Sequence, residues 1–334
     1  MDNRDRFIEH SLHTSMFFPQ TRLMVAGNPK AAGTTLRWWL LTAHGIDVDE
    51  SIRGSWWGES APRQAVWDDH AATRYIWPQL SEEVREDALE STDVLTVLPV
   101  RHPVTRAFSS WSSKYLVAEP YYEDRLPEDF GRLPETLSDA DDIAQHFEEF
   151  ATSLGQVVDE RGFDEIDVHL WPQHRLLART PLGPVLTLRQ EAMKGGLDQI
   201  ADHLRSHGID PGTAPRINET VVPYLNELVT DKAFSSVVAI YGDDLDHFGY
   251  SRERPPSSSR PLDIDWLNDV RGRNQRYGFL HRSLLHESDE NRRLRREVET
   301  AHRREEELLG STSWKATAPL RAVSRLARRG TAGS

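Results

Sequence analysis

The sequence contains no cysteine. This absence excludes a thiol nucleophile, a cysteine-based zinc site and a disulfide framework, and it is compatible with a reducing compartment. Long apolar runs are absent as well, since no stretch approaches the roughly 18 uninterrupted apolar residues that a membrane span needs. The first residues lack the apolar core of a secretion signal. We therefore expect a soluble, cytoplasmic protein.

Positive charge is in deficit, because 40 Lys and Arg residues stand against 53 Asp and Glu residues. Proteins that follow nucleic-acid phosphates carry a basic surplus, so we expect no nucleic-acid partner. The deficit is uneven: residues 119–167 are strongly acidic, whereas residues 310–334 contain five basic residues and no acid. Such a basic tail fits peripheral contact with the inner face of an anionic membrane. It fits a solvated chain terminus without a partner equally well.

Residues 21–45 have the pattern of a strand, a tight loop and a helix. Leu23–Ala26 is a short apolar run, glycines and a proline punctuate the loop, and the helix starts at Thr34 or Thr35. The free N–H groups at a helix start, together with the positive end of its dipole, favour an anion. Lys30 adds a mobile positive charge. The stretch therefore predicts a phosphate-binding loop, although alone it fits an ordinary surface turn about equally well.

A second unit of the same kind follows. Val94–Val100 is a β-branched run of strand length, and Pro103 opens a helix. Arg101 stands at the strand end, and Ser109 lies two helical turns further on, so both can reach one anion from a rigid frame. Arginine offers paired, planar donors that suit a phosphate group.

Two consecutive strand-loop-helix units predict an α/β domain with a mainly parallel sheet, helices on both faces and a ligand at the strand ends. Residues 119–140 are a loop by composition. Further predicted elements are a strand at 185–188, helices at 81–89, 143–158 and 196–204, and two helices within 220–250.

The domain organisation follows from changes in composition. We predict a first domain at residues 1–250, a Pro/Ser/Arg linker at 251–261, a charged helical segment at 262–309 and a basic tail at 310–334. Within the helical segment, a loose heptad with Asn291 on one line fits a homodimeric coiled coil. A single solvated helix fits it at least as well.

Two motifs carry a resemblance to a known family. The order Pro-Lys-x-x-Gly-Thr-Thr at 29–35 resembles the 5′-phosphosulfate loop of sulfotransferases that use 3′-phosphoadenosine 5′-phosphosulfate (PAPS). Val-Arg-x-Pro-x-x-Arg-x-x-Ser at 100–109 resembles the 3′-phosphate motif of the same family. The resemblance spans roughly residues 20–250 and implies a P-loop-like fold.

This resemblance also implies the donor site. In the family the lysine reaches the bridging oxygen of the sulfuryl group, and the Gly-Thr-Thr segment holds the 5′-phosphate. PAPS is then the sulfuryl donor, no metal is required, and Arg106 has a supporting role. The implied donor-binding residues are Lys30, Ala31, Ala32, Gly33, Thr34, Thr35, Arg101 and Ser109. The pair Ala31-Ala32 departs from many relatives, which leaves the fit of the loop to the sulfate open.

Sulfuryl transfer to a hydroxyl needs a base, and histidine is suited to this near neutral pH. His70 lies between the two motifs, in a segment that resembles the histidine segment of heparan 2-O-type carbohydrate sulfotransferases, and is the first candidate. His169 lies in Asp-Val-His-Leu-Trp-Pro-Gln, which resembles an Asp-x-His-x-x-Pro-Gln segment of carbohydrate sulfotransferases, and is the second. With Lys30, these two are the predicted catalytic residues.

We therefore expect sulfuryl transfer from PAPS to a hydroxyl of a carbohydrate or glycoconjugate. One alternative is an ATP-dependent small-molecule or sugar kinase, but Lys30 precedes Gly33 where a nucleoside-triphosphatase loop needs Gly-Lys-Ser/Thr. Another is a non-catalytic adaptor that acts through the C-terminal helix. The presence of Lys30, Arg101 and Ser109 together argues against it.

Overall fold

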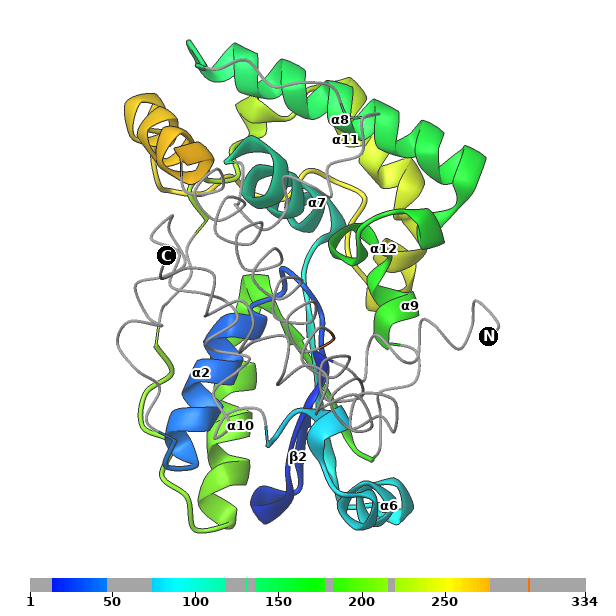
Figure 1. Cartoon of the computed structure of the whole chain (residues 1–334), viewed down its shortest axis with the longest axis vertical. Coiled ribbons are helices and arrows are strands. Elements are labelled where there is room, and N and C mark those ends of the chain that lie inside the picture. The colour runs from blue at the N-terminus through cyan, green and yellow to red at the C-terminus, as the bar shows by residue number, and fades with distance from the viewer. Residues whose placement is uncertain are drawn as a thin grey trace, which may run out of the picture. The chain divides into compact units, whose positions relative to one another are not determined.

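The computed structural model describes residues 14–46, 74–117, 130, 136–177, 183–215, 220–276 and 300. The chain divides into two compact units, Met1–Gly278 and Phe279–Ser334. The architecture below is that of the first unit (Figure 1). The histidine at position 70, the heptad of residues 284–298 and the basic tail lie outside the described residues.

A four-stranded sheet, ordered β1-β2-β3-β4, forms the centre of the unit. Its strands are β1 (Met16–Phe18), β2 (Leu23–Val25), β3 (Leu95–Val100) and β4 (Val185–Arg189). β3 runs parallel to both β2 and β4, whereas β1 is antiparallel to β2. The predicted mainly parallel α/β sheet is confirmed. β1 is an addition that the sequence did not predict.

One face of the sheet is covered by α2 (Gly33–Ala43) and α10 (Met193–Ser206). Side chains alternate along a strand, so Leu23 and Val25 point to this face. They join a buried apolar cluster with Leu36 of α2 and Leu204 of α10. Each fully buried leucine of this kind contributes about 1.5–3 kcal/mol relative to an exposed one.

The opposite face is covered at its lower end in Figure 1 by the short turn η3 (Trp77–Gln79) and by α6 (Glu82–Glu90). Met24 points here and packs in a cluster with Phe17 and Trp77. Ser81 is the N-cap of α6, and its hydroxyl accepts a hydrogen bond from Val84 N at 3.4 Å. This is the capped helix start that the sequence predicted.

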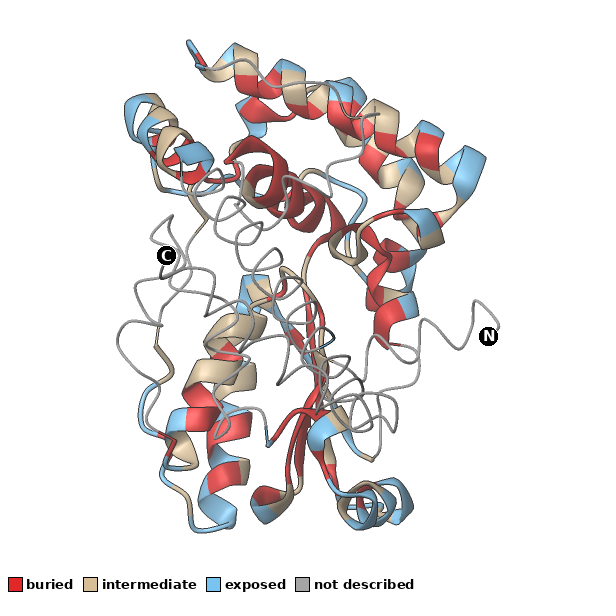
Figure 2. Cartoon of the chain, in the orientation of Figure 1, coloured by how far each residue is buried: buried red, intermediate tan, exposed pale blue. Residues whose placement is uncertain are grey.

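A layer of helices lies beyond the carboxyl ends of the strands. It contains α7 (Pro103–Trp111), the π-helical segment η4 (Ser112–Leu116), α8 (Ala140–Arg161), α11 (Asp231–Ile240) and α12 (Gly242–Phe248). α7 is buried along its whole length (Figure 2). Aromatic packing explains this burial, since the rings of Phe108 and Trp111 lie 5.0 and 5.1 Å from the ring of Phe147 on α8.

Short segments connect these elements: η1 (Pro19–Thr21), η7 (Phe163–Glu165), η8 (Val168–Leu170), α9 (Gln173–Leu177), η9 (Gln190–Ala192) and η10 (Asn226–Leu228). A further helix at 264–276 follows the predicted linker. Its Leu267 and Val270 are buried, and Asn274 donates to Val117 O at 2.7 Å, so this part of the chain packs in the first unit. In the part that the structure describes, no helix is both long and apolar enough to cross a membrane.

Candidate active site

The loop between β2 and α2 has a backbone shaped for an anion. Lys30 (φ 66°) and Ala32 (φ 60°) are in the left-handed region. Such residues turn neighbouring N–H groups toward a common concave side. Ala32 is also the N-cap of α2, where it provides no side-chain cap, and the first turn holds no acidic residue. The uncapped N-terminus of α2 is therefore suited to a phosphate or sulfate group.

Gly27, at the start of this loop, is required by a close approach. A Cβ atom at this position would overlap the Thr14 hydroxyl, and Gly27 N donates to Ser15 Oγ at 2.9 Å. Gly33 differs, because the nearest atom to an added Cβ would be Asn28 O at 3.8 Å, an ordinary contact. The structure thus holds the loop tightly where it leaves β2 and leaves room where α2 begins.

Arg101 lies at the carboxyl end of β3 and touches the loop. Its Nε donates to Thr105 Oγ1 at 3.0 Å, and its Nη1 donates to Lys30 O at 3.3 Å. Burial lowers the pKa of Arg101 to about 10, although Glu191 opposes the shift, so the guanidinium remains charged at neutral pH. The two sequence motifs therefore meet through one side chain.

Ser109 continues the same surface of α7. Thr105 and Ser109 are four residues apart and so share one face of the helix, and Thr105 already contacts Arg101. Ser109 is buried within α7. Both residues that the sequence assigned to the 3′-phosphate thus belong to one rigid strand-to-helix junction.

Arg106 joins the loop to a distant segment. Its Nε donates to Pro29 O at 3.0 Å and its Nη1 donates to Trp171 O at 2.8 Å. The side chain is 2% exposed, and burial lowers the pKa of Arg106. Its Nη2 is buried with no hydrogen-bond partner within the described parts of the chain. The supporting residue of the motif is therefore a link between two loops.

Gln173 makes a second link of this kind. Its Oε1 accepts from Arg101 N and from Asn28 Nδ2, both at 3.0 Å, and its Nε2 donates to Arg101 O at 2.8 Å. Asn28 Nδ2 also donates to Pro99 O at 2.8 Å. Gln173 is fully buried. The segment Asp167–Gln173 is thereby fixed to both motifs.

This segment carries the predicted residue His169. Asp167 Oδ1 accepts hydrogen bonds from His169 Nδ1 at 2.5 Å and from His169 N at 2.8 Å. Ser110 of α7 donates to His169 O at 2.8 Å. With Nδ1 carrying the proton, Nε2 is the nitrogen of the neutral ring that can accept one. The pair has the geometry of a base held by a carboxylate.

The electrostatics of the pair follow from burial and from two lysines. Burial, assisted by the charges of Lys114 and Lys30, lowers the pKa of His169 to about 3, although Asp167 opposes this shift. Burial alone would raise the pKa of Asp167, but its hydrogen bond from His169 and the charge of Lys114 hold it well below its ordinary value. The pair is a neutral imidazole beside an ionised carboxylate. The influence of Lys30 shows that this lysine lies within electrostatic range of the ring.

An acidic group, Glu191, acts on Arg101 through its charge. Glu191, in η9 just after β4, accepts from His102 N at 2.8 Å and from Tyr250 Oη at 2.9 Å. Burial and the charge of Glu191 raise the pKa of Tyr250, so its hydroxyl stays protonated and donates. Glu191 thus fixes the β3–α7 junction that presents Arg101.

The structure brings together most of the predicted site. Lys30, Arg101, Ser109 and His169 belong to one cluster of connected elements, whereas His70 lies outside the described residues. α2 starts at Gly33, one or two residues before the predicted start at Thr34 or Thr35. Within the described ranges, no group of three or more His, Asp or Glu side chains is placed to hold a metal ion.

Sequence reasoning missed several residues of the site: Asn28, Lys114, Asp167 and Gln173. Asp167 and Gln173 lie inside the quoted Asp-x-His-x-x-Pro-Gln string, so their presence there was the available signal. Asn28 and Lys114 had no local signal, because their partners are distant in the sequence.

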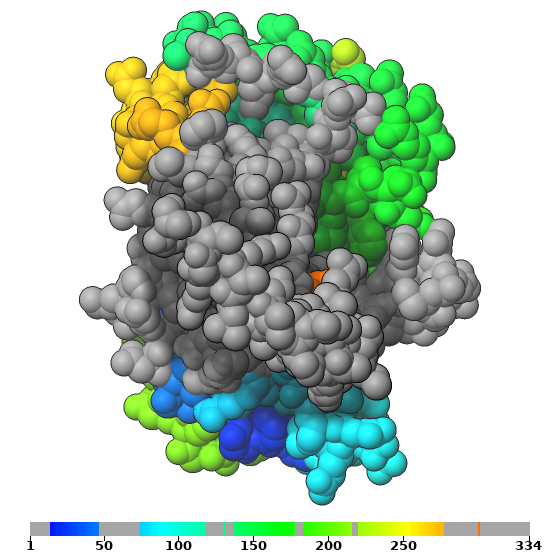
Figure 3. Space-filling view, in the orientation of Figure 1, coloured from blue at the N-terminus to red at the C-terminus, as the bar shows by residue number. Residues whose placement is uncertain are grey.

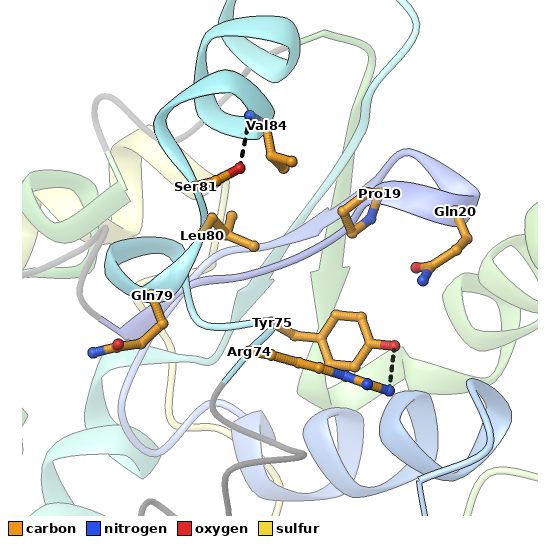
Figure 4. A pocket seen from close by; sticks show the side chains of 8 residues that line it. All are labelled: Pro19, Gln20, Arg74, Tyr75, Gln79, Leu80, Ser81 and Val84. Carbon is orange, nitrogen blue, oxygen red and sulfur yellow. Dashed lines mark hydrogen bonds between the residues drawn. The ribbon is translucent and has the colours of Figure 1, made fainter.

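A pocket of about 300 Å³ lies elsewhere, at the start of β2. The turn between β1 and β2 and helix α6 lie side by side at the lower edge of Figure 3, and Figure 4 shows the residues that line the pocket. These are Pro19, Gln20, Arg74, Tyr75, Gln79, Leu80, Ser81 and Val84. Because the motif residues lie at the carboxyl ends of β2 and β3, this pocket is separate from the candidate site.

Comparison with known proteins gives one result. A family model described as the sulfotransferase family matches residues 13–251, a span that includes both motifs and the segment Asp167–Gln173. No significant match was found among curated proteins or among solved structures.

Proposed function

The chain belongs to the sulfotransferase family, and we propose that it transfers a sulfuryl group from PAPS to a hydroxyl group of its acceptor. The observation that carries this proposal is the contact between Arg101 Nη1 and Lys30 O at 3.3 Å. It joins the motif for a 3′-phosphate to the loop for a 5′-phosphosulfate. PAPS carries both groups, whereas ATP carries no 3′-phosphate.

The residues on the donor side are suited to binding negatively charged groups. We assign the 3′-phosphate to Arg101 and Ser109, and the 5′-phosphosulfate to Lys30 and the N-terminus of α2. In the reaction, the bond between sulfur and the 5′-phosphate oxygen breaks while a bond from sulfur to the acceptor oxygen forms. Negative charge grows on the leaving phosphate, and Lys30 with the helix N-terminus stabilises it. This positive loop replaces the magnesium ion that kinases use.

On the acceptor side, we propose His169 as the group that receives the hydroxyl proton. Its hydrogen bonds to Asp167 and to Ser110 fix the ring, and Lys30 is close enough to influence its pKa. A bound donor places negative charge beside this ring, which raises its affinity for a proton. His169 therefore becomes a stronger base when the donor is present. His70 stays the alternative base on the sequence argument given above.

The finer identity of the acceptor rests on resemblance. The likeness of the His169 segment to that of carbohydrate sulfotransferases supports a carbohydrate or glycoconjugate acceptor. Peripheral membrane contact through residues 310–334, homodimer formation through the helical segment 262–309 and a cytoplasmic location remain proposals that rest on the sequence.

The donor is tested by calorimetry with 3′-phosphoadenosine 5′-phosphate (PAP), AMP and ATP. PAP should bind far more tightly than AMP, because each hydrogen bond to a charged group contributes roughly 1.5–3 kcal/mol. Equal affinity for PAP and AMP would contradict the assignment of the 3′-phosphate. Tighter binding of ATP with magnesium would instead support a kinase.

The base is tested by comparing His169→Ala with His70→Ala. Loss of a general base typically lowers turnover about 10²–10⁴-fold. We expect this loss for His169→Ala with the affinity for PAP nearly unchanged, and a small effect for His70→Ala. The reverse pattern would assign the base to His70.

A further inference from the structure

We infer that Arg106 is a positioning residue that holds the Lys30 loop and the His169 segment in a fixed relation to each other. This inference rests on the proposed function, because that function assigns the loop to the donor and His169 to the acceptor hydroxyl. It goes beyond it by giving a role to a side chain that binds neither substrate in the proposal.

The contacts of Arg106 lie at two informative places. Pro29 O, which accepts from Nε at 3.0 Å, belongs to the peptide group that precedes Lys30. Fixing this carbonyl fixes the plane that also contains the Lys30 N–H. Trp171 O, which accepts from Nη1 at 2.8 Å, lies two residues after His169. One guanidinium thus determines the orientation of the backbone next to the cation on one side and next to the base on the other.

Charge and burial indicate that this arrangement is not optimised for stability alone. Both hydrogen bonds go to neutral carbonyls, the side chain is 2% exposed, and Nη2 has no partner in the described part of the chain. A buried charge with an unsatisfied donor is unfavourable relative to an apolar contact. Asp244 and Asp167 act on it favourably through space, and the nearby charge of Arg101 acts against it.

Arginine is the residue type that can do this. Its planar guanidinium presents N–H donors in fixed directions, whereas a lysine ammonium is a point charge on a flexible stem. Lys at position 106 would keep the charge but could not hold two carbonyls in one plane. A variant with lysine therefore separates geometry from charge.

Gln173 provides independent support, because it links the same two regions by different atoms. Its side chain contacts Asn28 in the donor loop and Arg101 at the second motif. With both links present, ordering of the donor loop should be transmitted to the segment Asp167–Gln173. We therefore expect donor binding to stiffen that segment even where it makes no donor contact.

The experiment uses the full chain and compares wild type, Arg106→Lys and the control Arg254→Lys. Arg254 also donates to a backbone carbonyl, Val229 O at 2.6 Å, and pairs with Asp231, outside the site. Amide hydrogen exchange is followed in peptides covering residues 26–36 and 167–177, with and without PAP. Turnover, affinity for PAP and thermal unfolding are measured on the same samples.

In wild type, PAP should slow exchange in both peptides. Arg106→Lys should weaken PAP binding roughly tenfold, because the displaced Lys30 loop should lose about one hydrogen bond to the charged nucleotide. It should lower turnover by a larger factor and lose most of the PAP-induced slowing in 167–177. Arg254→Lys should retain all three properties. A double variant, Arg106→Lys with Gln173→Leu, should also lose the PAP-induced slowing in 167–177 that Arg106→Lys retains.

The inference is overturned if Arg106→Lys folds and shows wild-type turnover together with full PAP-induced slowing in 167–177. It is also overturned if PAP protects only residues 26–36 in wild type. Failure of wild type to bind PAP would instead reject the proposed donor. In that case, exchange without ligand still tests the link, since Arg106→Lys, unlike Arg254→Lys, should speed exchange in both peptides at once.

Discussion

The two strand-to-helix junctions of the site are built in different ways. Between β2 and α2 the chain makes a loop with two left-handed residues and begins a helix without a side-chain cap. Between β3 and α7 it turns within two residues, and His102 Nδ1 caps the helix by accepting from Val104 N at 3.2 Å. The first junction offers backbone donors, and the second offers side chains.

The difference extends to what supports each junction. α7 is buried on all sides by aromatic packing, so its side chains have a rigid base. The loop before α2 depends on contacts from outside, and Arg101 and Arg106 of the second junction hold the carbonyls of Lys30 and Pro29. The anion site proposed at the first junction therefore relies on a neighbouring junction, whose side chains keep its backbone groups in place.

Among substitutions at the two junctions, the largest effect should come from Lys30→Ala, which removes the side-chain charge of the first junction. Because this charge acts most strongly as the sulfuryl bond breaks, turnover should fall about 10²–10³-fold, the size seen when one transition-state donor is lost. Steady-state kinetics with calorimetry for PAP measure this, and Lys232→Ala at the exposed pair with Glu148 is the control. Equal losses in PAP affinity and turnover would mean that Lys30 only binds the donor.

A smaller effect is expected from Arg101→Ala, which sharpens the comparison. PAP affinity should fall roughly 10- to 100-fold through lost hydrogen bonds to the 3′-phosphate. AMP affinity should also fall, because Arg101 supports the loop at Lys30 O. Ser109→Ala should weaken PAP but not AMP. If Arg101→Ala leaves AMP affinity unchanged, the second junction does not support the first.

The smallest effect at neutral pH should come from Lys114→Met, and it concerns the pH profile. Lys114 and Lys30 disfavour a positive charge on His169, whereas Asp167 favours it, and burial has the largest influence. The pKa of about 3 means that kcat/KM, which reports the free enzyme, should not decline until well below the ordinary histidine value. Removing the Lys114 charge raises the pKa of His169, so the acid limb should move to higher pH.

The profile of kcat/KM from pH 3 to 8 measures this shift, with Lys232→Met as a matched control. A decline centred near pH 6.5 in wild type would exclude His169 as the base with this pKa. An acid limb that does not move in Lys114→Met would show that Lys114 has no influence on the reacting proton.

Local patterns in the sequence were sufficient for the main elements. The apolar runs predicted β2, β3 and β4 to within one residue at each end. β2 and β3 are buried parallel strands, which read as short apolar segments, whereas β4 is largely exposed and was recognised by its β-branched and leucine residues. The capped start of α6 and the proline that opens α7 could also be predicted, because both signals consist of neighbouring residues. β1 was not predicted, because a strand of three residues is too short to show the alternation of side chains that identifies a strand.

The supports of the site could not be predicted in this way. Asn28 and Gln173 are 145 residues apart, and Arg106 and Trp171 are 65 apart. Such contacts depend on how the sheet order places loops next to each other, and no local period encodes that order. The Asp-x-His-x-x-Pro-Gln string around His169 was recognised in the sequence. His169 was nevertheless placed second to His70, because His70 lies between the two motifs along the chain. Asp167 stands in that string, whereas the influence of the Lys114 charge on His169 has no counterpart in the sequence pattern.

The left-handed residues Lys30 and Ala32 have a consequence for the time course of donor capture. Each left-handed non-glycine residue is about 1–2 kcal/mol less favourable than the right-handed form, and contacts from the rest of the fold offset this strain. Little chain entropy remains to be lost when the anion arrives. The association rate of the nucleotide should then be set by diffusion and by the attraction of the surrounding cations. Its dissociation rate, and so its residence time, becomes the step that the protein can regulate.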